Sequence, residues 1–190
     1  MLLAALGLML GLAHGSSAAP ARVTAESAQE GTEYKVKAAS LYHFINYTTW
    51  PKEVFEDERS PVVLLVLGED PFGKALDELL KGKKAGGRSI RVLRAETLEK
   101  LPRAHMVFLA QSHAKELPAL LKAVAGTSAL VVGDSEGQAE QGAHVSFFVD
   151  SKRVGFAVNV TAVKRSKLTI SPEMLKLARI IEEKQNGDGR

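Results

Sequence analysis

The sequence predicts an α/β fold with a mainly parallel central sheet, helices on both faces, a late antiparallel hairpin and a C-terminal helix. Between residues 62 and 134, apolar runs of strand length alternate with helical segments, at the connection lengths that βα units use. Beyond residue 134, two further strands are separated only by a short Asp-Ser-Lys turn, which is typical of a hairpin.

The composition is that of one globular domain without a strong charge field. The chain has 190 residues, of which 45% are hydrophobic and 25% are charged, as in soluble domains with a sizeable core. Its 25 basic and 22 acidic residues nearly balance, so we expect no nucleic-acid partner. After the first residues no apolar run approaches the roughly 20 residues that a spanning helix needs, so no membrane span is expected.

The first residues have the pattern of a secretory signal peptide. An uncharged apolar run is followed by small residues, and Ser16 and Ala18 best fit the two small positions before cleavage. No Lys or Arg precedes the run, which a mis-assigned start codon would explain. The sequence contains no cysteine, so neither a disulfide nor an acylated lipoprotein cysteine is expected. We predict a signal peptide at 1–18, a flexible segment at 19–32, one domain at 33–184 and a disordered tail at 185–190.

The first predicted helix covers residues 33–50, since Glu33 opens a periodic segment and Pro51 ends it. Spacings of three and four place one apolar set along one side: Ala38, Leu41, Phe44, Ile45 and Thr48. An adjacent side carries Val36, His43 and Tyr47. The apolar face is therefore wider than a single core contact requires.

The remaining elements follow from apolar runs and their boundaries. Residues 62–68 form a continuous apolar run and are the best candidate for a central strand, whereas residues 89–95 alternate with charges and predict an edge strand. The other expected elements are helices at 72–80, 113–125 and 172–183 and strands at 105–110, 128–134, 144–150 and 153–160. This order is Rossmann-like or flavodoxin-like. Asn159 lies in an apolar context and is expected to fix the hairpin against the first helix or the loop after Asp134.

Open parallel sheets bind ligands beyond the carboxyl ends of their strands. The residues delivered there are Glu69, Asp70 and Phe72 in one loop, Gln111, Ser112 and His113 in the next, and Asp134 and Ser135 in the third. They predict a polar ligand cleft. Asp70 and Ser112 are also suited to cap helices, which is the more frequent role of such residues.

No catalytic, cofactor or metal motif is present in the sequence. A G-x-G-x-x-G fingerprint, a Walker motif, H-E-x-x-H and G-x-S-x-G are all missing. Ala110 and Gln111 stand at the end of the third strand, where a phosphoacceptor aspartate would be needed. Ser112 beside His113 is too local a pairing to imply a triad. We expect no enzyme, cofactor or metal site; a hydrolase using Asp134, Ser112 or His113 is the weakest alternative.

Several segments together resemble the YfiR family of exported bacterial proteins, over residues 33–181. The most specific are the helix ending in Trp50-Pro51, the strand and turn ending in GEDPFG, the FAVN strand and the SPEMLKLA segment. The resemblance implies a periplasmic regulator that represses a membrane diguanylate cyclase through its periplasmic sensor part and is released by an outer-membrane lipoprotein. Ala104 stands where family members often carry a cysteine, so redox control by disulfides is not expected.

Four aromatic side chains of the first helix are left over once its core stripe is assigned: Tyr42, His43, Tyr47 and Trp50. Aromatic rings with a polar edge are enriched at interfaces, so these residues predict a homodimer or partner surface. Packing under residues 52–60 is the alternative. The alternative function is a periplasmic small-ligand-binding module that uses the cleft at the strand ends.

Overall fold

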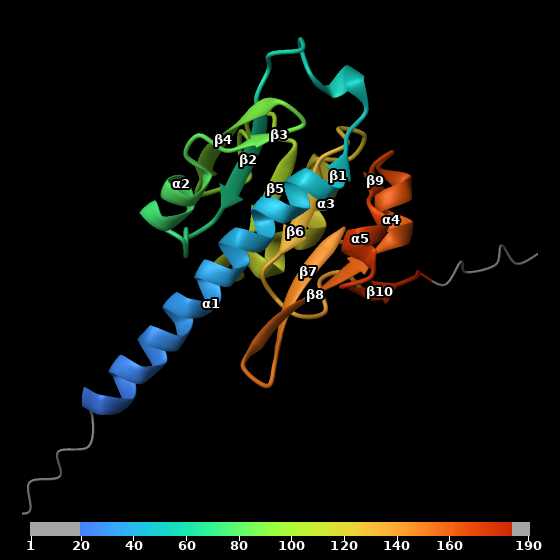
Figure 1. The fold of residues 1–190 in the computed structure, drawn as a ribbon. Coiled ribbons are helices and arrows are strands. Elements are labelled where there is room, and N and C mark those ends of the chain that lie inside the picture. Colours follow the sequence, from blue (N-terminus) through green and yellow to red (C-terminus); the bar gives the residue numbers. More distant parts are fainter. Residues whose placement is uncertain (1–19, 184–190) are drawn as a thin grey trace, which may run out of the picture.

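The computed structural model describes residues 20–183, which form a twisted sheet covered by helices (Figure 1). The predicted signal peptide and tail lie outside these residues. The helices are α1 Pro20–Tyr47, η1 Lys52–Val54, α2 Lys74–Leu80, η2 Gln111–Glu116, α3 Leu117–Ala123, α4 Val160–Arg165 and α5 Pro172–Leu175. The strands are β1 Thr48–Thr49, β2 Val62–Leu67, β3 Lys84–Ala85, β4 Arg88–Ala95, β5 Met106–Leu109, β6 Leu130–Gly133, β7 Val145–Asp150, β8 Arg153–Asn159, β9 Thr169–Ile170 and β10 Arg179–Ile181.

The main sheet has the strand order β10-β8-β7-β6-β5-β2-β4-β3. Strands β4, β2, β5, β6 and β7 are mutually parallel, and their order along the chain is 2-1-3-4-5, which is that of flavodoxin-like sheets. Strand β8 returns antiparallel to β7. The predicted mainly parallel sheet, the central position of β2 and the late hairpin are therefore confirmed.

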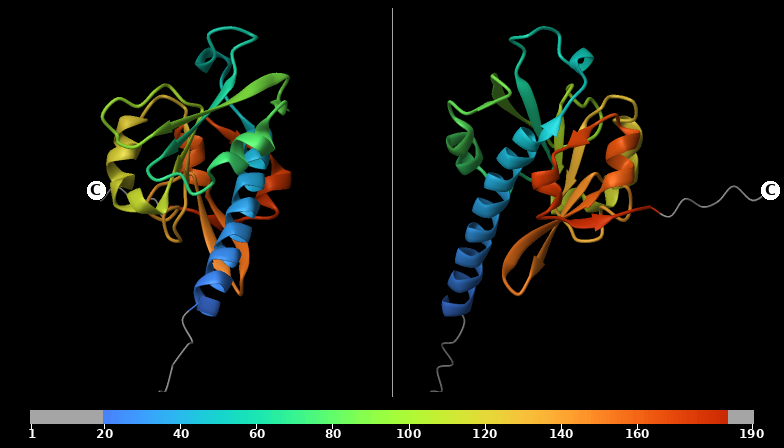
Figure 2. Two further views of the ribbon diagram at one scale, coloured as in Figure 1. Left: turned by 90° about the vertical axis from the view of Figure 1, so that its left-hand side faces the viewer. Right: turned by 45° about the vertical axis from the view of Figure 1, so that its right-hand side comes forward.

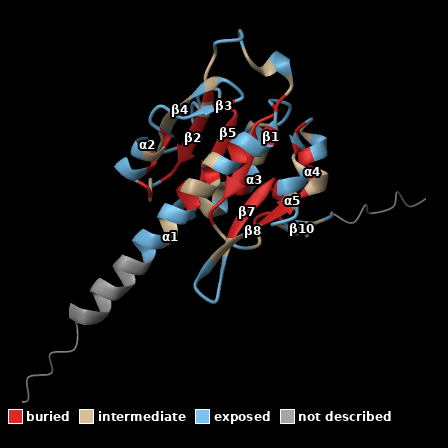
Figure 3. Ribbon diagram, in the orientation of Figure 1, coloured by how far each residue is buried: buried red, intermediate tan, exposed pale blue. Residues whose placement is uncertain are grey.

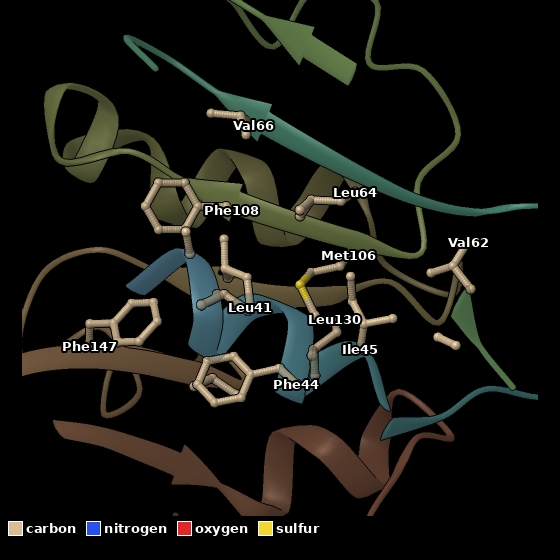
Figure 4. Packing of buried hydrophobic residues seen from close by; sticks show 14 of the residues in the cluster. Leu41, Phe44, Ile45, Val62, Leu64, Val66, Met106, Phe108, Leu130 and Phe147 are labelled. Carbon is tan, nitrogen blue, oxygen red and sulfur yellow. The ribbon is translucent and has the colours of Figure 1, made fainter. Parts of the chain in front are cut away.

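Helices cover both faces of the sheet because the central strands are apolar on both sides. Leu64 and Val66 of β2 belong to the cluster with α1 and α2, whereas Leu65 and Leu67 pack with α3, as the period of two along a strand requires. Figure 4 shows the α1 side chains Leu41, Phe44 and Ile45 among those of the neighbouring strands. Burial is concentrated along this layer (Figure 3).

Helix α1 differs from the predicted helix at both ends. It begins at Pro20, ahead of the predicted start at residue 33 (Figure 2), and the flexibility of residues 19–32 stays a prediction. It ends at Tyr47, because Thr48 and Thr49 pair with β9 in a separate two-stranded sheet. Strand pairs of this length carry no pattern that a sequence reveals.

The predicted C-terminal helix at 172–183 is wrong beyond its first turn. Ser171 caps Met174 and Pro172 opens the helix, but α5 ends at Leu175 and residues 179–181 form β10 beside β8. Leu177, an apolar residue of this segment, is 76% exposed. Two consecutive isoleucines favour a strand, and pairing with the free edge of β8 outweighs the helical spacing.

Asn159 joins three segments at the end of β8. Its side chain accepts a hydrogen bond from Ala162 N at the start of α4 and donates to the Ala139 carbonyl and to Glu183. The Ala139 bond confirms the expected link to the loop after Asp134. The link to the first helix is replaced by the cap of α4.

We expect Asn159→Ala to lower the free energy of unfolding by about 2 kcal/mol, because it leaves a buried amide and a buried carbonyl without partners. Urea denaturation measures the change. Asn46→Ala, which removes an exposed side-chain hydrogen bond to Tyr42 O, should change it by less than about 0.5 kcal/mol. Equal losses in the two variants would contradict this account.

Candidate functional site

A polar cavity lies at the carboxyl ends of β2, β5 and β6. Strand β4 lies on one side of β2 and β5 lies on the other, so the carboxyl ends of β2 and β5 are at a switch point of the sheet, where ligands bind in open α/β folds. The cavity has a volume of about 430 Å³, and its lining is Glu30, Tyr34, Glu69, Asp70, Pro71, Ala110, Gln111, Ser112 and Asp134. Its size is within the range of small-molecule sites.

Most residues predicted for the cleft lie together in this lining, namely Glu69, Asp70, Gln111, Ser112 and Asp134. Phe72, His113 and Ser135 do not. Phe72 is buried, meets the Tyr34 ring edge-on and packs at a tilt against the Phe108 ring. Ser135 uses its backbone N–H to donate to Gln138 Oε1 at 2.9 Å. Phe72 and Ser135 therefore shape the surroundings of the cavity and are not among its walls.

A buried ion pair joins α1 to the end of β6. Lys37 Nζ donates to Asp134 Oδ1 at 2.6 Å, and the two side chains are 4% and 1% exposed. Tyr34 donates its hydroxyl to Asp134 Oδ2 at 2.9 Å, and Glu33 lies 2.6 Å from the same Lys37 Nζ. These contacts position Asp134 at the wall of the cavity and fix α1 across the strand ends.

Burial sets the protonation behaviour of this cluster. Burial raises the pKa of Asp134, and the hydrogen bond and charge of Lys37 partly offset that effect. Burial also raises the pKa of the Tyr34 hydroxyl, and the neighbouring Asp134 raises it further. The Tyr34 hydroxyl is therefore protonated at neutral pH and can donate its hydrogen bond to Asp134.

Sequence reasoning missed the contribution of α1 to this site. Lys37 lies four residues before Leu41 and seven before Phe44, so helical spacing places it in the apolar stripe. A cation in such a stripe is rarely buried without an anionic partner. The position of Lys37 in the apolar stripe was thus the signal in the sequence that it is buried and paired. Its partner, Asp134, is distant in the sequence.

Asp70 and Ser112 were both suited to cap helices, but neither is the N-cap of a helix in the structure. The N-cap of α2 is Gly73 and that of η2 is Ala110. Asp70 instead accepts from Phe72 N at 2.8 Å and from Arg94 Nε at 2.6 Å. Ser112 Oγ accepts from Glu69 N at 3.1 Å, so the residue links the loops after β2 and β5.

The close approach of these two loops requires a glycine at position 68. Gly68 has a φ of 96°, a conformation that favours glycine. A Cβ there would lie 2.5 Å from His113 Nδ1 and 2.9 Å from Ser112 Oγ. The glycine therefore brings the backbone of the first loop against the side chains of the second.

Ser112, His113 and Glu116 do not form a catalytic triad. Ser112 Oγ lies 3.0 Å from His113 Nδ1, but His113 Nε2 is 3.9 Å from Glu116 Oε1, which is beyond hydrogen-bond distance. The histidine is therefore not oriented by the carboxylate as a triad requires. Among the side chains that the structure describes, those of residues 30–183, no group of three His, Cys, Asp or Glu is arranged to hold a metal ion.

Three of the four predicted interface aromatics lie on one side of α1, and we refer to Tyr42, His43 and Tyr47 as the α1 aromatic row. The His43 and Tyr47 rings are stacked with centroids 6.1 Å apart, and Tyr47 is 37% exposed. Tyr42 is half-buried, and Lys83 Nζ lies 5.3 Å from its ring centroid. The row presents aromatic edges beside a basic side chain.

Trp50, the fourth predicted interface residue, belongs to the core. It is only 8% exposed, donates Nε1–H to the His105 carbonyl at 3.0 Å, and meets the His105 ring edge-on. The helix ends before Trp50, so the chain turns its indole inward. Trp50 is therefore a core residue and not part of an exposed surface.

Two solved structures resemble part of the fold. One is described as the ABC domain in complex with L-Trp from Streptococcus pneumonia and the other as a conserved domain protein from Vibrio cholerae O1 biovar El Tor N16961. Both have a TM-score of 0.48, with sequence identities of 11% and 16%. The alignments cover 63% and 64% of this chain, which spans about half (55%) of each of those proteins.

No helix within residues 20–183 combines the length and the apolar character needed to cross a bilayer. The model of the YfiR/HmsC-like family, DUF4154, matches residues 34–179, which run from Tyr34 at the candidate site to Arg179 at the start of β10. The chain belongs to the YfiR/HmsC-like family.

Proposed function

We propose that this protein is a non-catalytic periplasmic regulator that binds and represses the periplasmic sensor part of a membrane diguanylate cyclase, thereby lowering cyclic di-GMP. The family match carries the proposal, since membership of the YfiR/HmsC-like family implies a periplasmic regulator of cyclic di-GMP signalling. Relief of repression by an outer-membrane lipoprotein is part of the same proposal, and the resulting output is biofilm behaviour.

The α1 aromatic row supports binding to a protein partner. His43 and Tyr47 are exposed and stacked, so their rings are already ordered before a partner arrives. Aromatic residues with few rotatable bonds lose little entropy on association and are enriched at interface hot spots. The same surface is the proposed homodimer face, and the two uses would compete.

We expect the double variant His43→Ala/Tyr47→Ala to weaken association with the membrane partner by about tenfold or more. Co-purification from solubilised membranes, followed by titration of the recovered sensor, measures this. Lys35→Ala, also exposed on α1, is the matched control. The melting temperature should change little because the replaced side chains are not in the core.

Two results would count against this surface. Loss of folding in the double variant would place the two rings in the core, and unchanged binding would place the interface elsewhere. Failure of the wild-type chain to recover any sensor protein would contradict the proposed function itself. Sedimentation of the same variants tests the homodimer.

The alternative function is a periplasmic small-ligand-binding module, and the 430 Å³ cavity at the strand ends favours it. Amino acids and nucleotides are the probes, because their amines, hydroxyls and ring nitrogens match a lining of carboxylates, Ser112 and Gln111. A ligand that raises the melting temperature of the wild type, but not of Ser112→Ala/Glu69→Gln, would support it. The absence of any shift across the set would exclude it for these ligand classes.

A further inference from the structure

A second cavity lies at the opposite end of the sheet, at the amino ends of β5 and β6. Its volume is about 680 Å³, within the range of ligand sites. Leu101, Ala104, Val107, Val124 and Ala129 give it apolar walls. This cavity shares no residue with the candidate site, whose walls follow the same strands at their carboxyl ends.

Two basic side chains stand at this cavity. Arg103 and Lys167 both line it and are exposed, and neither side chain forms an ion pair or a hydrogen bond with the described side chains and backbone of residues 30–183. Glu53 is the acidic residue of the lining, so the lining has a net positive charge. An apolar pocket with a cationic rim is complementary to an anion that has an apolar body.

Lys167 has a left-handed backbone conformation, which is unusual for lysine. Lys167 N donates to Lys164 O, and Leu168 N donates to Val163 O, which is the hydrogen-bond pattern of a Schellman ending of α4. The left-handed position of that ending normally carries glycine, and Lys167 has a φ of 57°. Glycine would end the helix with less strain, and the side chain that lysine adds at this position lines the cavity.

A second strained residue lines the same cavity. Ser128 has a φ of 55°. The remaining non-glycine residues with positive φ, Ser151 and Lys152, form the turn between β7 and β8, where such conformations are ordinary. Within residues 20–183, Ser128 and Lys167 are therefore the only non-glycine residues with a positive φ outside that turn. Both line this cavity.

One wall of the cavity is held in place by a stack of side chains. Pro51 and Val54 contribute to the lining from the segment after β1. In that segment Phe55 stacks on His105 with centroids 4.4 Å apart, and the guanidinium of Arg88 lies 3.9 Å from the Phe55 ring. Arg88 also donates to the carbonyls of Asp57 and Ser60, so the wall is ordered before any ligand binds.

We propose that this cavity binds a small organic anion with an apolar body, such as a medium-chain carboxylate. Arg103 and Lys167 bind the carboxylate, and Leu101, Val107 and Val124 contact the chain. The site goes beyond the proposed regulatory function, which assigns no ligand to this end of the sheet. Charge complementarity selects the anion, and the apolar walls exclude strongly hydrated ions such as inorganic phosphate.

Isothermal titration of the purified chain with octanoate tests the proposal, with octylamine and inorganic phosphate as matched ligands. We expect saturable binding of octanoate with a dissociation constant at or below about 1 mM and no binding of the other two. Arg103→Gln and Lys167→Gly should each weaken octanoate binding by about tenfold.

The Lys167→Gly variant separates a ligand role from a structural one. It should raise the melting temperature, because glycine suits the left-handed position, while it weakens octanoate binding. Lys152→Gly, at another left-handed position outside the cavity, should also be stabilised but should bind octanoate normally. Lys100→Gln controls for the loss of a nearby exposed charge.

Three outcomes would overturn the proposal: no saturable octanoate binding, binding that both cavity variants leave unchanged, or equal binding of octylamine. Association with phosphatidylglycerol vesicles without binding of free octanoate would also overturn it, because the ligand would then be a membrane surface. These titrations need no partner protein, so their failure leaves the proposed regulatory function untouched.

Discussion

Replacing Lys37 by methionine should lower the free energy of unfolding by about 3–5 kcal/mol, the loss typical of breaking a buried ion pair from one side. Asp134 would keep only the Tyr34 hydroxyl and neighbouring backbone as partners, with its side chain almost fully buried. Methionine fills similar volume, so the loss would come from the unpaired carboxylate and not from a cavity. Urea denaturation at pH 7 measures it.

Two companion variants identify the cause. Lys35→Met, on the exposed side of the same helix, should change stability by less than about 0.5 kcal/mol. Adding Asp134→Asn to Lys37→Met should recover most of the loss, because no buried charge then lacks a partner. The deficit of Lys37→Met should also shrink at lower pH, where Asp134 can protonate. A loss below about 1 kcal/mol would show that the pair contributes little.

Acidification from pH 7 to pH 4 should remove about 3 kcal/mol of stability through His144 alone, since each unit of pKa shift corresponds to about 1.4 kcal/mol. His144 Nδ1 accepts from Val131 N at 2.9 Å, and its Nε2 lies 2.7 Å from Ser166 Oγ. The ring must be neutral to accept at Nδ1. Burial, aided by Arg165, lowers its pKa from 6.5 to about 4.

The sign follows from proton binding. The unfolded chain binds a proton at His144 below about pH 6.5, whereas the folded chain does so only near pH 4. The stabilising contribution is therefore fully present above pH 6.5 and is lost as the pH falls toward 4. The groups that face the ring are Val131 N, Ser166 and Arg165.

Comparison of the wild type with His144→Gln isolates this residue from the carboxylates that also titrate in acid. Glutamine does not titrate, so the stability difference between the two proteins should narrow by about 3 kcal/mol between pH 7 and pH 4. A stability difference between wild type and His144→Gln that is the same at pH 7 and pH 4 would show that His144 is not the source of this pH dependence.

His105 has the same arrangement as His144, since its Nδ1 accepts a hydrogen bond from Val63 N and burial lowers its pKa.

The central strands were predictable because their signal is local. Strand β2 is apolar at every position from Val62 to Leu67, which a strand covered on both faces requires. The polar residues that follow β2, β5 and β6 could be placed at one end of the sheet for the same reason, because parallel strands share that end. The five predicted residues of the cavity wall depend on this topology alone.

The missed features depend on partners distant in the sequence. Lys37 needs Asp134, and β10 needs the edge of β8, which begins 26 residues before it at Arg153. The apolar residues at 172–183 have helical spacing, but residues 179–181 form a strand because the edge of β8 is available for pairing. Trp50 has an aromatic edge like those of Tyr42 and Tyr47, but it packs in the core and donates to the carbonyl of His105, which is distant in the sequence.

Cyclic di-GMP in cells tests the central claim most directly. Deletion of the gene should raise the cyclic di-GMP concentration, expression of the wild-type chain should restore it, and His43→Ala/Tyr47→Ala expressed at the same level should not. Lys35→Ala should behave as the wild type. A cyclic di-GMP concentration that deletion leaves unchanged, in cells that make the protein and its membrane cyclase, would contradict a role as repressor.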